Sequence, residues 1–109
     1  MEENIENLHH TAKLIRLDIQ AVIPEGVYGL EKYEFQREMF KAVTLRVLEM
    51  MKYEFEQLVD ALYRIDVSEE MAKKAFLNNS EIEIAQELAR LIIERESQKV
   101  QTRMKYAKK

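Results

Sequence analysis

The chain has 109 residues, a net charge of −3 and no cysteine. This length is enough for one hydrophobic core, and the apolar share of 47% exceeds that of disordered chains. The lack of cysteine excludes disulfides and thiolate chemistry, and we expect a reducing, cytoplasmic environment. No apolar run approaches the roughly 18 residues of a transmembrane segment, and the acidic pair Glu2-Glu3 is unlike the start of a secretory signal.

The first predicted helix covers residues 4–23. Apolar residues recur there three and four positions apart, as one face of a helix requires; they are Ile5, Leu8, Ala12, Ile15, Ile19 and Val22. Pro24 is expected to end the helix, because the residue before a proline avoids the helical conformation. Residues 24–29 contain both glycines and the only proline, and we expect them to form a loop.

Residues 31–65 are predicted to form one long helix, because neither glycine nor proline interrupts them. At 1.5 Å per residue the helix would be a rod of roughly 50 Å. Glu54 projects onto its apolar face, and we expect the carboxylate to reach a basic side chain or solvent at the edge. The apolar face comprises Phe40, Val43, Val47, Leu48, Met51, Phe55, Leu58, Leu62 and Ile65.

Two capping-box patterns predict the starts of the last two helices. The residues Asp66-Val67-Ser68-Glu69 are expected to open a short helix that ends at Asn78-Asn79, and Ser80-Glu81-Ile82-Glu83 to open the last helix. The apolar face of the last helix leads on to Glu96, so we expect core packing to weaken near Ile93. This predicts a helical bundle domain, 1–96, and a basic extension of the last helix, 97–109.

The four segments together predict an all-α fold, an antiparallel helical bundle of three long helices plus one short helix. Short connections between helices favour antiparallel neighbours, and near-heptad spacing favours shallow crossing angles. Strand-rich folds are excluded, because two glycines and one proline cannot supply a turn every 8–12 residues or so.

The first helix carries a second apolar row almost opposite the first. Its members are His10, Leu14, Leu17 and Ala21. The last helix or residues 24–30 cover this row within the monomer, or the row binds a partner, or its members are single exposed apolar residues of the kind common on protein surfaces. The partner would be a second copy in a two-fold dimer, the commonest assembly, or another helical protein. Phe35, Met39 and Tyr53 also lie outside the main apolar face, which favours the partner hypothesis.

The C-terminal extension is a candidate anion-binding tail. It contains no acidic residue and five basic ones: Lys99, Arg103, Lys105, Lys108 and Lys109. One interpretation is pairing with the chain's own Glu31, Glu34 and Glu38. The others are a protein partner, or weak and salt-sensitive binding of nucleic acid or an anionic lipid surface.

The sequence predicts no catalytic residues, no metal and no cofactor. His9 and His10 are the only histidines, and adjacent helical residues point about 100° apart, so the two cannot chelate one ion. Ser68 and Ser80 are explained by helix starts rather than by nucleophilic catalysis. We therefore expect a non-enzymatic module for protein–protein interaction or homo-oligomerisation, with the basic tail as the alternative binding site.

Overall fold

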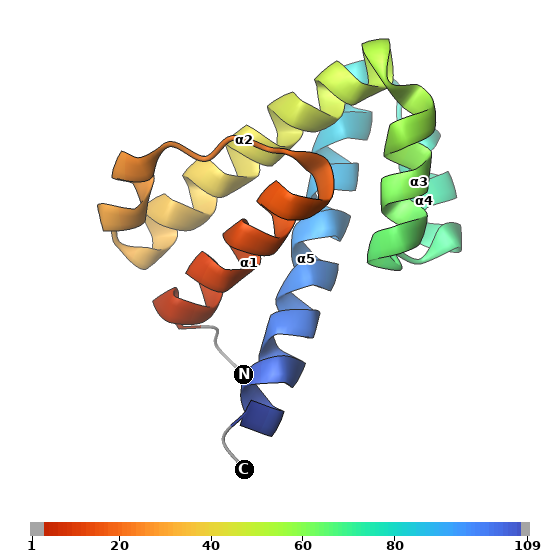
Figure 1. The fold of residues 1–109 in the computed structure, drawn as a ribbon. Coiled ribbons are helices and arrows are strands. Elements are labelled where there is room, and N and C mark those ends of the chain that lie inside the picture. Colours follow the sequence, from red (N-terminus) through yellow and green to blue (C-terminus); the bar gives the residue numbers. More distant parts are fainter. Residues whose placement is uncertain (1–3, 108–109) are drawn as a thin grey trace.

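The computed structural model describes residues 4–107, and its regular structure is helical throughout (Figure 1). The predicted all-α class is confirmed, since the described residues contain no strand. The elements in chain order are α1 (Ile5–Ile19), the 3-10 helix η1 (Glu25–Gly29), α2 (Lys32–Tyr53), α3 (Phe55–Ile65), α4 (Glu69–Phe76) and α5 (Glu81–Ala107). The antiparallel order of a bundle stays a prediction.

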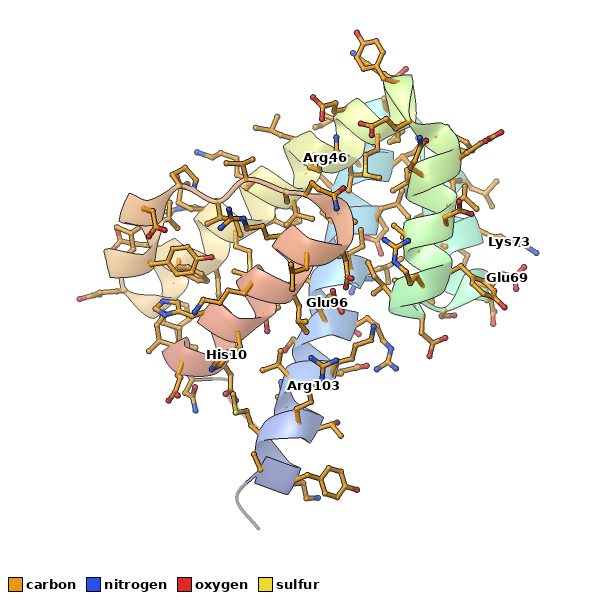
Figure 2. All side chains as sticks on the ribbon, in the orientation of Figure 1. His10, Arg46, Glu69, Lys73, Glu96 and Arg103 are labelled. Carbon is orange, nitrogen blue, oxygen red and sulfur yellow. The ribbon has the colours of Figure 1, made fainter. Side chains whose placement is uncertain are left out.

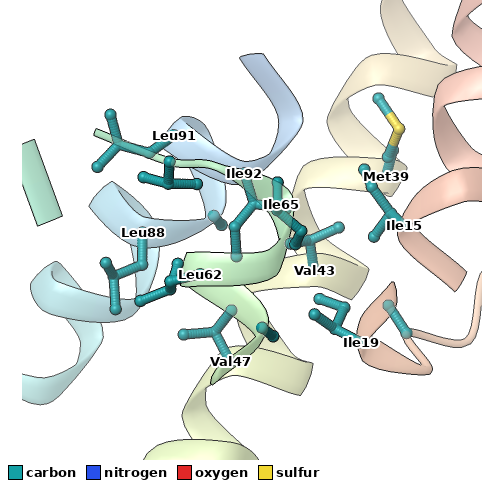
Figure 3. Close-up of a cluster of buried hydrophobic side chains, with 14 of the residues drawn as sticks. Ile15, Ile19, Met39, Val43, Val47, Leu62, Ile65, Leu88, Leu91 and Ile92 are labelled. Carbon is teal, nitrogen blue, oxygen red and sulfur yellow. The ribbon is translucent and has the colours of Figure 1, made fainter. Parts of the chain in front are cut away.

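Helix α5 organises the core, because it contacts each of the other four α-helices. Figure 1 shows it passing between α1 with α2 on one side and α3 with α4 on the other. Ile92 is fully buried at the centre of these contacts, as are Ile15, Val43 and Ile65 (Figure 3). One continuous core therefore links the helices.

The predicted long helix over residues 31–65 is wrong, because it divides at Glu54 into α2 and α3. Glu54 has φ −142° and ψ 47°, outside the helical region. Hydrogen bonding is hardly interrupted, since the Glu54 N–H still donates to Met50 and the Glu54 carbonyl accepts from Leu58. A straight rod of roughly 50 Å would also exceed the longest dimension of the molecule, 41 Å.

The break turns two apolar faces towards α5. Val43 and Val47 of α2 are fully buried, and so are Leu58 and Ile65 of α3. The Glu54 carboxylate pairs with Arg46 at 2.8 Å, as expected for a charge at the edge of the face. The hydrogen bond from Arg46 holds the pKa of Glu54 below its usual value.

Helix α1 ends at Ile19, earlier than the proline predicts. Gln20 adopts a left-handed conformation with φ 57°, and its N–H donates to the carbonyl of Arg16. The remaining residues before Pro24 are not helical. Val22 is consequently 79% exposed and does not join the core.

One of the two predicted helix starts is confirmed. The Ser80 hydroxyl accepts a hydrogen bond from the Glu83 N–H at 3.2 Å and donates to the Glu83 carboxylate at 2.9 Å. The other start lies two residues later than predicted, because Ser68 caps α4 by accepting from Met71. Asp66 instead ends α3, in a left-handed conformation with φ 69°.

One further expectation about packing is wrong and another is confirmed. Phe35 and Met39 are core residues, with exposures of 0% and 1%, and therefore give no support to a partner surface. As expected, the hydrophobic core cluster extends no further along α5 than Ile93. Individual side chains beyond it are still buried, since Glu96 is fully buried and Val100 is 3% exposed.

Candidate interaction surface

An open groove of about 160 Å³ lies between α1 and the final turns of α5. We name it the α1–α5 groove; it is lined by His10, Lys13, Leu14, Leu17, Val100, Arg103 and Met104. Figure 2 shows His10 on α1 and Arg103 on α5 at the same end of the molecule. The groove therefore joins the two surfaces that the sequence predicted separately, the second apolar row and the basic tail.

The second apolar row is only partly accessible. Leu17 is 73% exposed, whereas Leu14 and His10 are half-buried beside α5. Ala21 is fully buried, because α1 ends before it and the helical spacing no longer applies. Ala21 is therefore not part of the surface, and Leu17 is its most accessible apolar member.

The α1–α5 groove is basic. Lys13 and Arg103 line it, and neither forms an ion pair within the described part of the chain. None of its seven lining residues is acidic. Apolar lining and uncompensated positive charge therefore occur in the same small site.

The described part of the tail, residues 97–107, forms no ion pair with the acidic residues at the start of α2. Of its described basic residues, Lys99 alone forms an ion pair, and the partner is Glu96 on its own helix. No ion pair within residues 4–107 connects the tail to Glu31, Glu34 or Glu38, so that interpretation is wrong for these residues. Lys105 is exposed, while Lys108 and Lys109 lie outside the described residues.

Glu96 is a buried acid one helical turn from the groove. The Nζ of Lys99 lies 3.3 Å from its Oε1, yet neither carboxylate oxygen has a hydrogen-bond partner among the described residues. Burial raises the pKa of Glu96 to about 7, the neighbouring Asp18 of α1 adds to the rise, and Lys99 opposes it. The sequence placed Glu96 on the buried face, but its charge suggested that the core ended there.

A second groove, of about 290 Å³, lies between α3 and α4 and was not predicted. We name it the α3–α4 groove; it is lined by Val59, Leu62, Tyr63, Val67, Glu69, Ala72, Lys73 and Phe76. Its two charged residues, Glu69 and Lys73, pair with each other at 3.4 Å (Figure 2). Tyr63 is 88% exposed beside it. The groove depends on how α3 meets α4, a tertiary contact that spacing within one helix does not predict.

The residues with catalytic or metal-binding chemistry have other contacts. The His9 ring packs against Tyr28 and Phe35, with centroid distances of 5.1 and 4.8 Å. Ser68 and Ser80 cap helices. Within residues 4–107, no three side chains of metal-ligating type lie close enough to hold an ion. None of the described helices has the length and hydropathy needed to cross a bilayer.

Comparison with known proteins assigns the chain to no family, since no family model, no curated protein and no solved structure matches it.

Proposed function

We propose that this chain is a non-enzymatic protein-interaction module and that the α1–α5 groove is its binding site. The observation that carries the proposal is the combination of an apolar lining with a highly exposed rim residue, Leu17. A volume of about 160 Å³ is close to the roughly 150 Å³ that holds a benzene ring in an engineered protein cavity. The groove thus suits one large apolar side chain of a partner, the usual form of a binding hot spot.

The chemistry of the lining favours binding over catalysis. Leu14, Leu17, Val100 and Met104 supply contact area, and Lys13 and Arg103 supply charge. An enzyme site would need a base or nucleophile positioned beside the substrate. His10 is the one imidazole in the lining, and no hydrogen bond or ion pair orients it among the described residues.

Self-association is a second candidate, and the α3–α4 groove favours it. Val59 and Tyr63 are 46% and 88% exposed, and the Glu69–Lys73 pair leaves the groove without net charge. Two copies of such a face meet without repulsion between like charges, as a two-fold dimer requires. Weak binding of nucleic acid or an anionic surface remains the alternative for Arg103 and Lys105.

The test is site-specific photo-crosslinking in the cells that produce the protein. The photoreactive residue p-benzoylphenylalanine replaces Leu17 in one variant and Val22 in the matched control, because their exposures are similar, 73% and 79%. We expect discrete, protease-sensitive adducts from position 17 that position 22 does not give. Identical patterns from both positions, or no adduct from position 17, would overturn the proposal.

The same experiment separates the other candidates. A third variant carries the photoreactive residue at Tyr63, beside the α3–α4 groove. An adduct of twice the chain's mass from this position supports self-association, and its absence argues against it. Adducts from position 17 that are removed by nuclease rather than protease would favour the basic-tail alternative over the protein-interaction module.

A further inference from the structure

We infer that the partner of the α1–α5 groove is an acidic amphipathic helix, which inserts one large apolar side chain between flanking carboxylates. This inference rests on the proposed function and adds the chemistry of the partner. It is carried by the position of two cations, Lys13 on α1 and Arg103 on α5, on the lining of one apolar site.

The charge of the site is uncompensated. Neither Lys13 nor Arg103 forms an ion pair within residues 4–107, and the seven lining residues include no carboxylate. Lys99, the next basic residue on α5, is already paired with Glu96. A partner with carboxylates beside its anchor side chain would meet these cations directly, and complementary charge of this kind sets partner choice and association rate.

The shape of the site favours a side chain over a surface. Val100 lies in the lining but is only 3% exposed, so a partner must reach into the groove to contact it. A bilayer surface presents no such projection. A nucleic-acid backbone would use the two cations but gain little from Leu14, Leu17 and Met104, whereas a helix with apolar residues at positions i, i+3 or i+4, and i+7 uses both kinds of contact.

A second copy of this chain is a poor occupant of this groove. In a two-fold contact the same patch meets itself, which would place Lys13 and Arg103 against the same cations of the other copy. Like charges opposed across an interface disfavour it. The α3–α4 groove, whose charges are paired, lacks this obstacle. The two grooves therefore differ in the partners that they select.

The test uses two fluorescently labelled synthetic helical peptides with the full-length protein. Both carry Leu and Phe at positions i, i+3 and i+7; the first has Glu at the flanking positions and the second has Lys. Fluorescence anisotropy measures binding at low and high salt. We expect the Glu peptide to bind, with affinity that falls as salt rises, and the Lys peptide to bind at least about tenfold more weakly.

Charge reversal provides the matched variants. The double substitution Lys13→Glu and Arg103→Glu should lower the affinity for the Glu peptide by about tenfold or more and raise the affinity for the Lys peptide. Lys73→Glu, a single charge reversal in the α3–α4 groove, should leave both affinities unchanged. Circular dichroism and thermal unfolding of each variant establish that the fold is retained. Loss of binding in the Lys73→Glu variant would overturn the assignment to the α1–α5 groove.

The remaining outcomes distinguish this inference from the proposed function. Equal affinity for the two peptides would overturn the acidic partner while leaving an apolar binding groove. Failure of the Glu peptide to bind at concentrations up to about 1 mM would also overturn the inference of an acidic partner. The proposed function would then be decided separately, by crosslinking from position 17. Tighter binding of a DNA duplex, or of phosphatidylserine vesicles, than of the Glu peptide would assign the cations to a different class of partner.

Discussion

The side chain of Arg46 joins the end of α1 to the middle of α2, because its Nε donates a hydrogen bond of 2.6 Å to the carbonyl of Ile19. The same guanidinium pairs with Glu54 at the break between α2 and α3. Positive charge at the carboxyl end of a helix also interacts favourably with the helix dipole. One side chain, 13% exposed, thus fixes three helices relative to one another.

The substitution Arg46→Met should therefore destabilise the fold by about 1–3 kcal/mol, because it leaves a carbonyl without its charged donor. Urea unfolding followed by circular dichroism measures this loss. Arg90→Met is the matched control, since Arg90 is 46% exposed and its ion pairs within residues 4–107 are with Glu87 and Glu94 on its own helix. Exposed pairs contribute about 0–1 kcal/mol, so equal losses in the two variants would contradict the proposed role of Arg46.

Glu96 should make the fold less stable as the pH rises from about 4.5 to about 7, the range between the usual pKa of a Glu and its raised value here. In this range the unfolded chain loses the Glu96 proton while the folded chain retains it. The unfolded state thus binds fewer protons, and the free energy of unfolding falls with increasing pH. The penalty is complete above pH 7 and absent below 4.5.

The variant Glu96→Gln isolates this effect. It should be more stable than the wild type at pH 8, by about 1–3 kcal/mol, and the difference should vanish as the pH falls towards 4.5. Glu54 and Glu87 do not mask the trend, because their lowered pKa values act below 4.5 and remove stability only on further acidification. A difference between variant and wild type that is independent of pH would show that Glu96 titrates normally.

Removal of the basic segment should destabilise the bundle. A chain that ends at Glu96 loses Val100, which is 3% exposed. Its free energy of unfolding should be lower than that of the full chain by at least about 2 kcal/mol. A chain that ends at Thr102 keeps this contact and serves as the control. If both shortened chains were as stable as the full chain, the predicted domain boundary at residue 96 would be supported.

The substitution Ser80→Ala should cost about 1 kcal/mol, because the N-terminal amides of α5 lose their side-chain acceptor. Thr102→Ala is the control, since the Thr102 hydroxyl only donates to the Gln98 carbonyl within the same helix. Thermal unfolding gives the melting temperatures of the two variants, which are then compared. Equal melting temperatures would mean that Ser80 does not stabilise the start of α5.

The local signal at Ser80 correctly predicted the start of α5, whereas those at Asp66 and Pro24 misplaced the ends of two other helices. The Ser80–Glu83 capping box was identified because every atom that it needs lies within four residues. The break at Glu54 was not, since its partner Arg46 and the packing against α5 are tertiary features. Ala21 was misplaced for a related reason: periodicity assumes that a helix continues, whereas Gln20 ends α1.

Part of the lining of the α1–α5 groove was predicted from the sequence. Leu14 and Leu17 were identified from helical spacing, and Arg103 from the charge of the tail, but spacing within one helix cannot show that two helices meet. The α3–α4 groove could not be identified either, because the packing of Val59 and Tyr63 of α3 beside α4 is a tertiary feature. Sequence patterns predict which face of a helix is apolar. Which faces pack together depends on where each helix begins and ends, and on tertiary packing.

The contacts of α5 with every other α-helix also constrain how the protein is made. Synthesis proceeds from the amino terminus, so α1 to α4 leave the ribosome before the helix that covers them. Until α5 follows, the core that buries Ile15, Val43 and Ile65 is incomplete. Nascent chains at this stage expose apolar surface to chaperones and to one another, and the core can be completed only after α5 has emerged.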